Sequence, residues 1–334
     1  MACEDVKFHY PSNTAFLACG NLTNRMEWYP AGGFLAPPKN KVYHEYFLKY
    51  DVDSNVTTRL SIENWNPEED LVLHGLDIWQ SEQKDELLLY AVNHKQSGES
   101  IAIFSHTLGT NTLHLVEQYT HPLIKTPNQV TAAGPREFFI TNDHYFYSGV
   151  GRRLEEMYGP FSWASSIAYC AESKGNVVCK QVSPANSHAY ANGLLMLDDG
   201  KTLAVADVVA GSISLYNIDS DTKMLNLGNA IVLGASPDNL SQVSDTGDLI
   251  VAVIPNEEAL YARFIGGGLL DHTMPVPAAV LRLVKAKGFA PEVLYWDDGS
   301  LISILTSGAV DKERGLLVAG GVFERHFIVC KIEY

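Results

Sequence analysis

The chain has 334 residues, of which 46% are hydrophobic, and this is enough to bury a sizeable core. It carries 39 acidic and 24 basic side chains, and the formal net charge of -15 argues against nucleic acid and anionic membrane surfaces as partners. No run of roughly 18 apolar residues occurs in the sequence, so we expect no membrane span.

Short apolar or alternating segments, separated by turn clusters, predict an all-β chain. The expected strands are, in chain order, 85–92, 101–105, 136–141, 202–207, 212–216, 249–253, 292–296 and 316–322. Turn-forming residues occur between them at 96–98, 173–176, 198–201, 245–248 and 297–300. Only two segments, 153–161 and 256–263, predict helices, and we expect both to be insertions over one face.

A degenerate repeat favours a β-propeller. Ser187–Tyr216 and Pro237–Ile254 share one order: a polar residue, apolar residues, an Asp-containing turn with Gly, and a strand. At about 50 residues per blade, the chain length predicts about six blades. No linker divides residues 1–334, so we expect a single domain. We also expect the last strand, 326–330, to complete the blade that the N-terminus begins, which would bring Cys330 close to Cys3.

One pair among the five cysteines is expected to form a disulfide. Segment 167–179 predicts a β-hairpin, and a two-residue turn at Lys174-Gly175 places Cys170 opposite Cys179. Counting out from the turn, the two cysteines form a non-hydrogen-bonded pair, which is the closer kind and suits a disulfide. Because the number of cysteines is odd, at least one thiol stays unpaired.

The sequence leaves two cellular locations open. Two sequons, at Asn21 and Asn55, fit a secreted protein. No signal peptide is visible, since Met1-Ala2 leads directly into Cys3. We therefore expect either a secreted protein whose upstream segment has been removed or, as the alternative, a cytoplasmic protein.

Adjacent pairs of oxygen-bearing side chains occur at Glu4-Asp5, Asn142-Asp143 and Asp238-Asn239. Neighbouring side chains of an extended strand point to opposite faces, so each pair could serve two different sites. A single such pair is more often a turn or a helix cap. Three pairs of carboxylate and amide oxygens together favour a hard cation such as calcium.

On these residues the chain resembles the paraoxonase/arylesterase family of calcium-dependent lactonases, which are six-bladed propellers. The resemblance covers nearly the whole chain, and the expected nearest relatives are fungal or bacterial members. It rests on segments that follow one another in the family's order: Cys3–Val6, His74-Gly75, Val92–His94, Thr141–Phe146, Tyr190–Gly193, Asp238-Asn239 and Thr246–Leu249.

The resemblance implies two calcium ions in a central tunnel. The side chains that match the ligands of the upper, catalytic ion are Glu4, Asn142, Asn192, Asp238 and Asn239. Those that match the deeper, structural ion are Asp5, Asp143 and, through its backbone carbonyl, Leu76. Two carboxylates and three amides would leave the upper ion electrophilic enough to take a substrate oxygen.

The resemblance also implies a pair of catalytic histidines. His74 matches the general base that acts on water, His94 matches its proton-relay partner, and Tyr190 would line the substrate pocket. A neutral imidazole can accept a proton from water near neutral pH, although without the resemblance either residue would be taken for a hydrogen-bonded, half-buried histidine. The chain differs from the animal members of the family in two respects. Their N-terminal anchoring helix is not seen here, and Ile254 stands where they have a histidine at the rim of the pocket.

The function that the resemblance implies is calcium-dependent hydrolysis of lactones or aryl esters, with a small molecule as substrate. A cyclase or isomerase of specialised metabolism is the alternative, because it could use the same calcium site with water excluded. A propeller that keeps calcium for rigidity alone is a third possibility, and His74 with its ligand set favours catalysis over it. The rim segments 26–38 and 256–275 match the family poorly, so the shape of the pocket is the property that the resemblance predicts least well.

Overall fold

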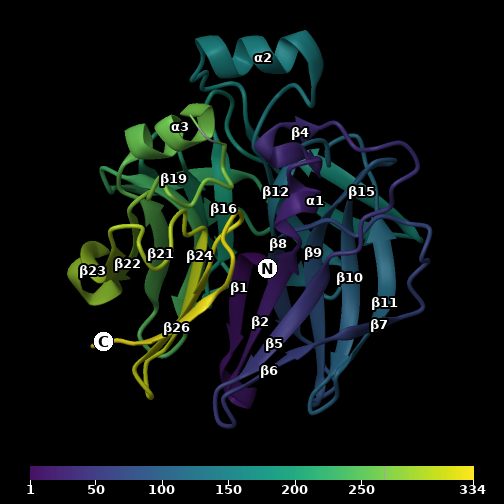
Figure 1. Ribbon diagram of the computed structural model, residues 1–334. Coiled ribbons are helices and arrows are strands. Elements are labelled where there is room, and N and C mark those ends of the chain that lie inside the picture. The colour runs from purple at the N-terminus through teal and green to yellow at the C-terminus, as the bar shows by residue number, and fades with distance from the viewer. Residues whose placement is uncertain (267) are drawn as a thin grey trace.

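Strands that follow one another along the chain form six sheets, the blades of a β-propeller (Figure 1). The computed structural model describes residues 1–266 and 268–334. From the innermost strand outwards, the first three blades are β1 (Ala2–His9), β2 (Thr14–Gly20), β5 (Tyr46–Asp51), β6 (Val56–Arg59); β8 (Leu73–Gln80), β9 (Glu86–Lys95), β10 (Gly98–Thr107), β11 (Thr112–Tyr119), β7 (Ser61–Glu63); and β12 (Pro127–Gly134), β13 (Glu137–Asn142), β14 (Ser166–Ser173), β15 (Asn176–Gln181).

The second half of the chain repeats this arrangement. Its blades are β16 (Ala191–Met196), β17 (Thr202–Asp207), β18 (Ser212–Ile218), β19 (Leu225–Val232); β20 (Ser236–Val243), β21 (Asp248–Ile254), β22 (Ala278–Val284), β23 (Ala290–Asp297); and β24 (Ser307–Asp311), β25 (Leu316–Gly320), β26 (Ile328–Lys331). The innermost strands β1, β8, β12, β16, β20 and β24 contact one another in that order and close a ring. All eight predicted strands overlap observed ones, and the all-β, six-bladed prediction is confirmed.

The ring closes differently from the sequence expectation. Strand β26 pairs with β25 in its own three-stranded blade, and it does not join the first blade. The outer edge of the first blade is already covered by β6, so no place remains there for a C-terminal strand. Instead β1 packs against β24. Cys3 is bonded to Cys19, and Cys330 keeps its thiol among the described residues.

The hairpin prediction is confirmed. Strands β14 and β15 pair with Cys170 opposite Cys179, and a disulfide joins the two residues. The turn residues Lys174 and Gly175 have φ angles of 53° and 80°. Such positive values at both positions are those of the tight turn that suits the twist of a two-residue hairpin.

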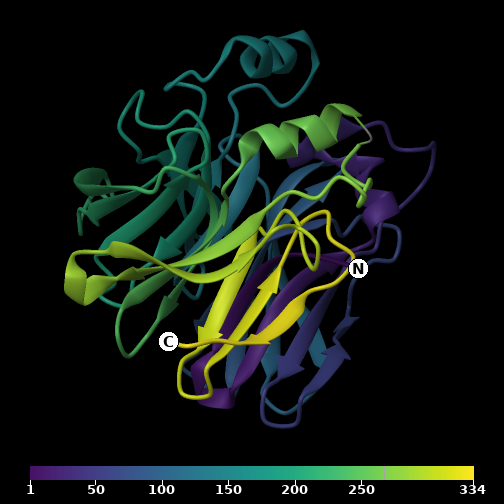
Figure 2. The ribbon, with the colours of Figure 1, turned by 60° about the vertical axis from the view of Figure 1, so that its left-hand side comes forward.

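The helices gather at one end of the propeller, as the two views show together (Figures 1 and 2). Helix α2 (Gly149–Tyr158) begins four residues before the predicted segment and α3 (Glu257–Gly266) begins one residue after it. The same end carries a short helix, α1 (Leu22–Arg25), and the small sheet of β3 (Trp28–Tyr29) and β4 (Phe34–Leu35). Within residues 1–266 and 268–334, no helix is long and apolar enough to cross a membrane.

The hydrophobic core lies between neighbouring blades. In one cluster, Leu195 and Ile213 of the fourth blade pack with Leu249 and Leu281 of the fifth, and all four are buried. Similar clusters fill the other interfaces between blades. Because the faces of the sheets pack against one another, only the free edges of the innermost strands face the axis. Polar side chains on these edges can therefore converge at the centre.

Candidate active site on the propeller axis

An irregularity of strand pairing brings polar side chains to the axis in five of the six blades. The innermost strand shifts register at the residues that follow Cys3, Leu73, Pro127, Ala191 and Pro237. At four of these shifts, two residues of the innermost strand lie opposite one residue of the neighbouring strand, as in a β-bulge. A β-bulge changes the direction of the side chains that it contains. The residues at the shifts are Glu4, His74-Gly75, Asn128-Gln129, Asn192-Gly193 and Asp238-Asn239.

This geometry changes the reason why adjacent oxygen-bearing residues matter. The sequence argument assumed an extended backbone, in which neighbours point to opposite faces. At the bulges both neighbours reach the axis: Glu4 accepts a hydrogen bond from Asn239 at 2.6 Å, and Asp5 accepts one from Gln129 at 2.7 Å. Glycine at two bulges lets the blades approach closely, because a Cβ on Gly193 would lie 2.3 Å from the carbonyl oxygen of Asp238.

Four buried oxygens at the axis have no hydrogen-bond partner among the described residues. They belong to four different blades and are Glu4 Oε2, Asn128 Oδ1, Asn192 Oδ1 and Asp238 Oδ1. A buried acceptor without a donor costs free energy, and four together call for a positively charged partner. Carboxylate and amide oxygens are the ligands that calcium prefers, so these residues fit a calcium ion.

No cluster of three His, Cys, Asp or Glu side chains suited to a metal occurs in the part of the chain described here. Two of the four unpartnered oxygens belong to amide side chains, so this ligand set is not a cluster of His, Cys, Asp and Glu. The donor chemistry is that of a hard cation rather than of zinc, which takes nitrogen and sulfur ligands.

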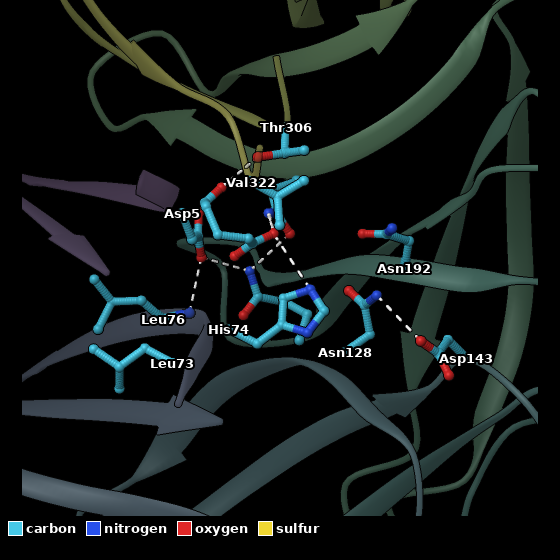
Figure 3. A network of polar contacts seen from close by, with 12 residues as sticks. Asp5, Leu73, His74, Leu76, Asn128, Asp143, Asn192, Thr306 and Val322 are labelled. Atoms are coloured by element: carbon cyan, nitrogen blue, oxygen red, sulfur yellow. Dashed lines mark hydrogen bonds and ion pairs between the residues drawn. The ribbon is translucent and has the colours of Figure 1, made fainter. Parts of the chain in front are cut away.

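Neither Asn142 nor Asp143 supplies one of these four oxygens, although Asn128 Nδ2 donates to Asp143 Oδ2 at 3.5 Å (Figure 3). The Asn142 side chain holds a loop, because its oxygen accepts the backbone N–H groups of Lys125 and Thr126, each at 3.0 Å. Asp143 binds His144 Nδ1 at 2.8 Å, and in Figure 3 it lies across the network from Asp5. Strand β13, which ends at Asn142, is the second strand of its blade and not the innermost. Asn128, on the innermost strand, stands at the axis instead.

A row of hydrogen-bonded side chains leads from the axis through His74 and His94. His74 Nδ1 lies 2.9 Å from His94 Nε2, and His94 Nδ1 lies 2.5 Å from Glu99 Oε2. If both rings are neutral, the Glu99 carboxylate fixes the proton of His94 on Nδ1, and His74 then donates from its own Nδ1. The lone pair of His74 Nε2 consequently faces Glu4 Oε1, at 3.5 Å, which is longer than a good hydrogen bond.

Aromatic and basic side chains hold the two histidines in place. The Tyr29 ring lies 5.1 Å from that of His74 and 5.8 Å from that of His94. Trp28 donates from its indole nitrogen to the His94 carbonyl at 2.7 Å. Both aromatic residues come from the small β3–β4 sheet at the helical end, so this insertion packs directly over the histidine pair.

Negative charge accumulates at the axis. Burial, followed by the charges of Glu4 and Asp5, raises the pKa of Asp238 well above its ordinary value. Burial also raises the pKa of Asp5 to about 6, and the charge of Glu4 adds to the effect, although Lys7 opposes it. A cation at the four unpartnered oxygens would relieve this repulsion.

The comparisons with known proteins agree with the fold. A family profile described as "Arylesterase" matches residues 8–332. The chain belongs to this family. Serum paraoxonase/arylesterase 1 of Mus musculus is 30% identical over 273 residues, which are 80% of this chain and 68% of the relative. Serum paraoxonase/lactonase 3 of Mus musculus is 27% identical over 324 residues, which are 96% of this chain and 84% of the relative.

Solved structures share the fold of this arylesterase-family chain. A putative 6-phosphogluconolactonase from Bacteroides uniformis has a TM-score of 0.53 at 13% identity, covering 96% of this chain and 95% of that one. A luciferin-regenerating enzyme has a TM-score of 0.52 at 15% identity, covering 97% and 85%. At these identities the likeness shows the propeller architecture alone.

A hollow of about 650 Å³ opens above the axis at the helical end. Tyr190, Asn192 and Asp238 stand in its wall. Most of its remaining wall is apolar, including Ile254 and Phe323. A volume of this size suits a small-molecule ligand with an apolar body and one polar group directed at the axis.

Sequence reasoning missed Asn128, Gln129 and Glu99. A signal for Glu99 existed, because the turn at 96–98 sets Glu99 opposite His94 across the β9–β10 hairpin. Asn128 and Gln129 precede an apolar alternating strand in the same way as Asn192 and Asp238 do. Their assignment needed the blade boundaries, which the sequence places only roughly.

Proposed function

We propose that this chain is a calcium-dependent hydrolase of lactones or aryl esters. The observation that carries the proposal is the group of four unpartnered, buried oxygens. Two of the residues that supply them, Asn192 and Asp238, line the apolar hollow, and a third, Glu4, lies 3.5 Å from the oriented imidazole of His74. Membership of the arylesterase family and the names of the mouse relatives support the substrate class.

The proposed ligands of the catalytic ion are Glu4, Asn128, Asn192 and Asp238, with Asn239 next to them through its hydrogen bond to Glu4. Asn128 replaces Asn142, the residue that the sequence suggested. When bound, calcium supplies polarisation of the substrate carbonyl and charge stabilisation of the oxyanion. The apolar wall of the hollow strengthens such electrostatic effects, because it excludes water from around the reacting group.

His74 is the proposed general base. Its Nε2 atom accepts a proton from the attacking water, whose oxygen forms a bond to the acyl carbon. Glu99, through His94, stabilises the resulting positive charge and holds His74 in the required tautomer. When the acyl carbon–oxygen bond breaks, the same proton passes to the leaving alkoxide or phenoxide, which gives a carboxylate and an alcohol. Tyr190 is proposed to contact the body of the substrate.

The test is hydrolysis of a panel of lactones and aryl esters, with calcium and with a chelator. We expect calcium-dependent turnover of at least one substrate, lost in Asp238→Asn and kept in Asp298→Asn, which removes an exposed carboxylate from a surface turn. Activity that survives chelation would refute the calcium role. Calcium binding without hydrolysis of any substrate would favour the cyclase or isomerase alternative, which uses the same ion.

We also propose that the chain matures in an oxidising compartment and is secreted. The two disulfides, Cys3–Cys19 and Cys170–Cys179, support this, because such bonds persist mainly outside the cytosol. Alkylation of the protein from its natural source, followed by mass spectrometry, tests the proposal. Four free thiols at these positions would contradict it.

A further inference from the structure

A lysine ammonium lies on the propeller axis beneath the proposed calcium site. Lys7 extends from the innermost strand β1 and is only 5% exposed. Its Nζ atom donates to the Leu240 carbonyl of the fifth blade at 2.8 Å and to Asp5 Oδ1 at 3.1 Å. A buried ammonium is costly unless it is paired, and here a carboxylate and a carbonyl, both ordinary calcium ligands, surround it.

The Asp5 carboxylate is fully used by donors from this chain. Its Oδ1 atom accepts from the Val6 N–H at 2.8 Å and from Lys7, and its Oδ2 atom accepts from the Leu76 N–H at 2.8 Å and from Gln129 Nε2 at 2.7 Å. Figure 3 shows Leu76 directed at Asp5. The contrast with Glu4 and Asp238 is direct, because each of those side chains keeps an oxygen without a donor.

The charges favour one divalent ion over two. Three carboxylates at the axis, Glu4, Asp5 and Asp238, face the single ammonium of Lys7, which leaves two negative charges to neutralise. One calcium ion does so, whereas two would leave an excess of positive charge. Asp77 and Lys7 both line a hollow of about 370 Å³, which is distinct from the one that Asn192 and Asp238 line, and water in it can screen the Asp77 charge.

We propose that Lys7 is a built-in cation that takes the place of the deeper calcium ion, so that this chain binds one calcium ion instead of two. Two other ligands of the deeper ion were expected, Asp143 and the carbonyl of Leu76. Both oxygens of Asp143 have partners, His144 and Asn128, and Leu76 directs its N–H group at Asp5. The assignment of Lys7 rests on its own contacts. Only the expected count of one rests on the proposed function.

The first test is the ion content of the wild-type protein after gel filtration in calcium buffer, measured by inductively coupled plasma mass spectrometry. We expect one calcium ion per chain. Two ions per chain would overturn the proposal. No bound ion would refute the calcium role in the proposed function but would agree with Lys7 as the occupant of the deeper site, so the two failures can be told apart.

The second test is a pair of charge deletions read by thermal unfolding in chelator. Lys7→Met should lower the melting temperature by several degrees, since it leaves the buried Asp5 charge unpaired. Lys7→Met combined with Asp5→Asn should recover most of the loss. Lys287→Met is the matched control, because it removes an ammonium from an exposed ion pair with Glu292. A Lys7→Met loss no larger than that of the control would overturn the proposal, as would a double variant no more stable than Lys7→Met.

Discussion

Replacing His74 by glutamine separates the proton-accepting role from the cation site. Glutamine has a similar length, and its amide can donate to His94 Nε2 as the imidazole does at 2.9 Å. It cannot accept a proton from water. Loss of a general base typically lowers the rate by about 10²–10⁴-fold. We therefore expect His74→Gln to raise the barrier of the chemical step by about 3–5 kcal/mol.

The assay compares kcat, KM and bound calcium for the wild type, His74→Gln and a control. His106→Gln is a suitable control, because His106 is also a buried histidine of the second blade, and its Nδ1 atom lies 2.9 Å from the Thr112 carbonyl, outside the proposed relay. We expect His74→Gln to lose kcat and keep its calcium, since none of the four unpartnered oxygens belongs to His74. His106→Gln should keep kcat even where its melting temperature falls.

Two results would refute this reasoning. Wild-type kcat in His74→Gln would remove the imidazole from the mechanism and leave attack by unassisted water. Loss of calcium together with activity would show that His74 acts by supporting the Glu4 carboxylate, 3.5 Å away, rather than as a base. Glu99→Gln should lie between the wild type and His74→Gln, because Glu99 acts only by orienting and charging His94.

Further predictions concern stability. In scanning calorimetry, calcium should raise the melting temperature of the wild type more than that of Asp238→Asn. In chelator, burial raises the pKa of Asp5 from 3.8 to about 6, so the folded state keeps a proton that the unfolded state has released. The urea-derived stability of the wild type relative to Asp5→Asn should therefore fall by about 2 kcal/mol as the pH rises from about 4 to 6; a rise would contradict it. Serine at Cys3 should cost about 2–4 kcal/mol on urea unfolding. Alanine at Gly193 should reduce both stability and calcium binding, measured by calorimetry, because its Cβ would overlap the Asp238 carbonyl.

The blade architecture was readable from the sequence because it depends on local signals. Turn residues such as Lys174-Gly175 fix a hairpin within a few residues, and hydrophobic alternation fixes the strands on either side. The pairing of Cys170 with Cys179 followed from the same local count. The way in which the ring closes could not be predicted from such local signals. It depends on which edge strand of the first blade is free to pair, and β5 of that blade is already paired with β6.

The three pairs of oxygen-bearing residues were selected by residue type, and the structure distinguishes them by their place in the blades. Asn142-Asp143 looked like Asp238-Asn239, yet Asn142 ends a second strand and Asp238 lies in a bulge of an innermost strand. A pair of oxygen-bearing residues is therefore insufficient evidence for a ligand. The distinguishing feature is the position after the first residues of an innermost strand, as in Pro127-Asn128, Ala191-Asn192 and Pro237-Asp238.

The bulges also explain how one fold can keep a reactive site at its most buried point. Regular strands would pair all along their length, whereas each bulge releases one or two residues from the ladder and can direct polar side chains to the axis. The bulges leave a set of hydrogen-bond acceptors without donors, and two different cations can compensate them. At the lower level this chain supplies its own ammonium, Lys7, which is fixed and unreactive. At the upper level, in the proposed function, Glu4 and Asp238 are left for an exchangeable cation, and the His74 imidazole is the proposed acceptor of a proton.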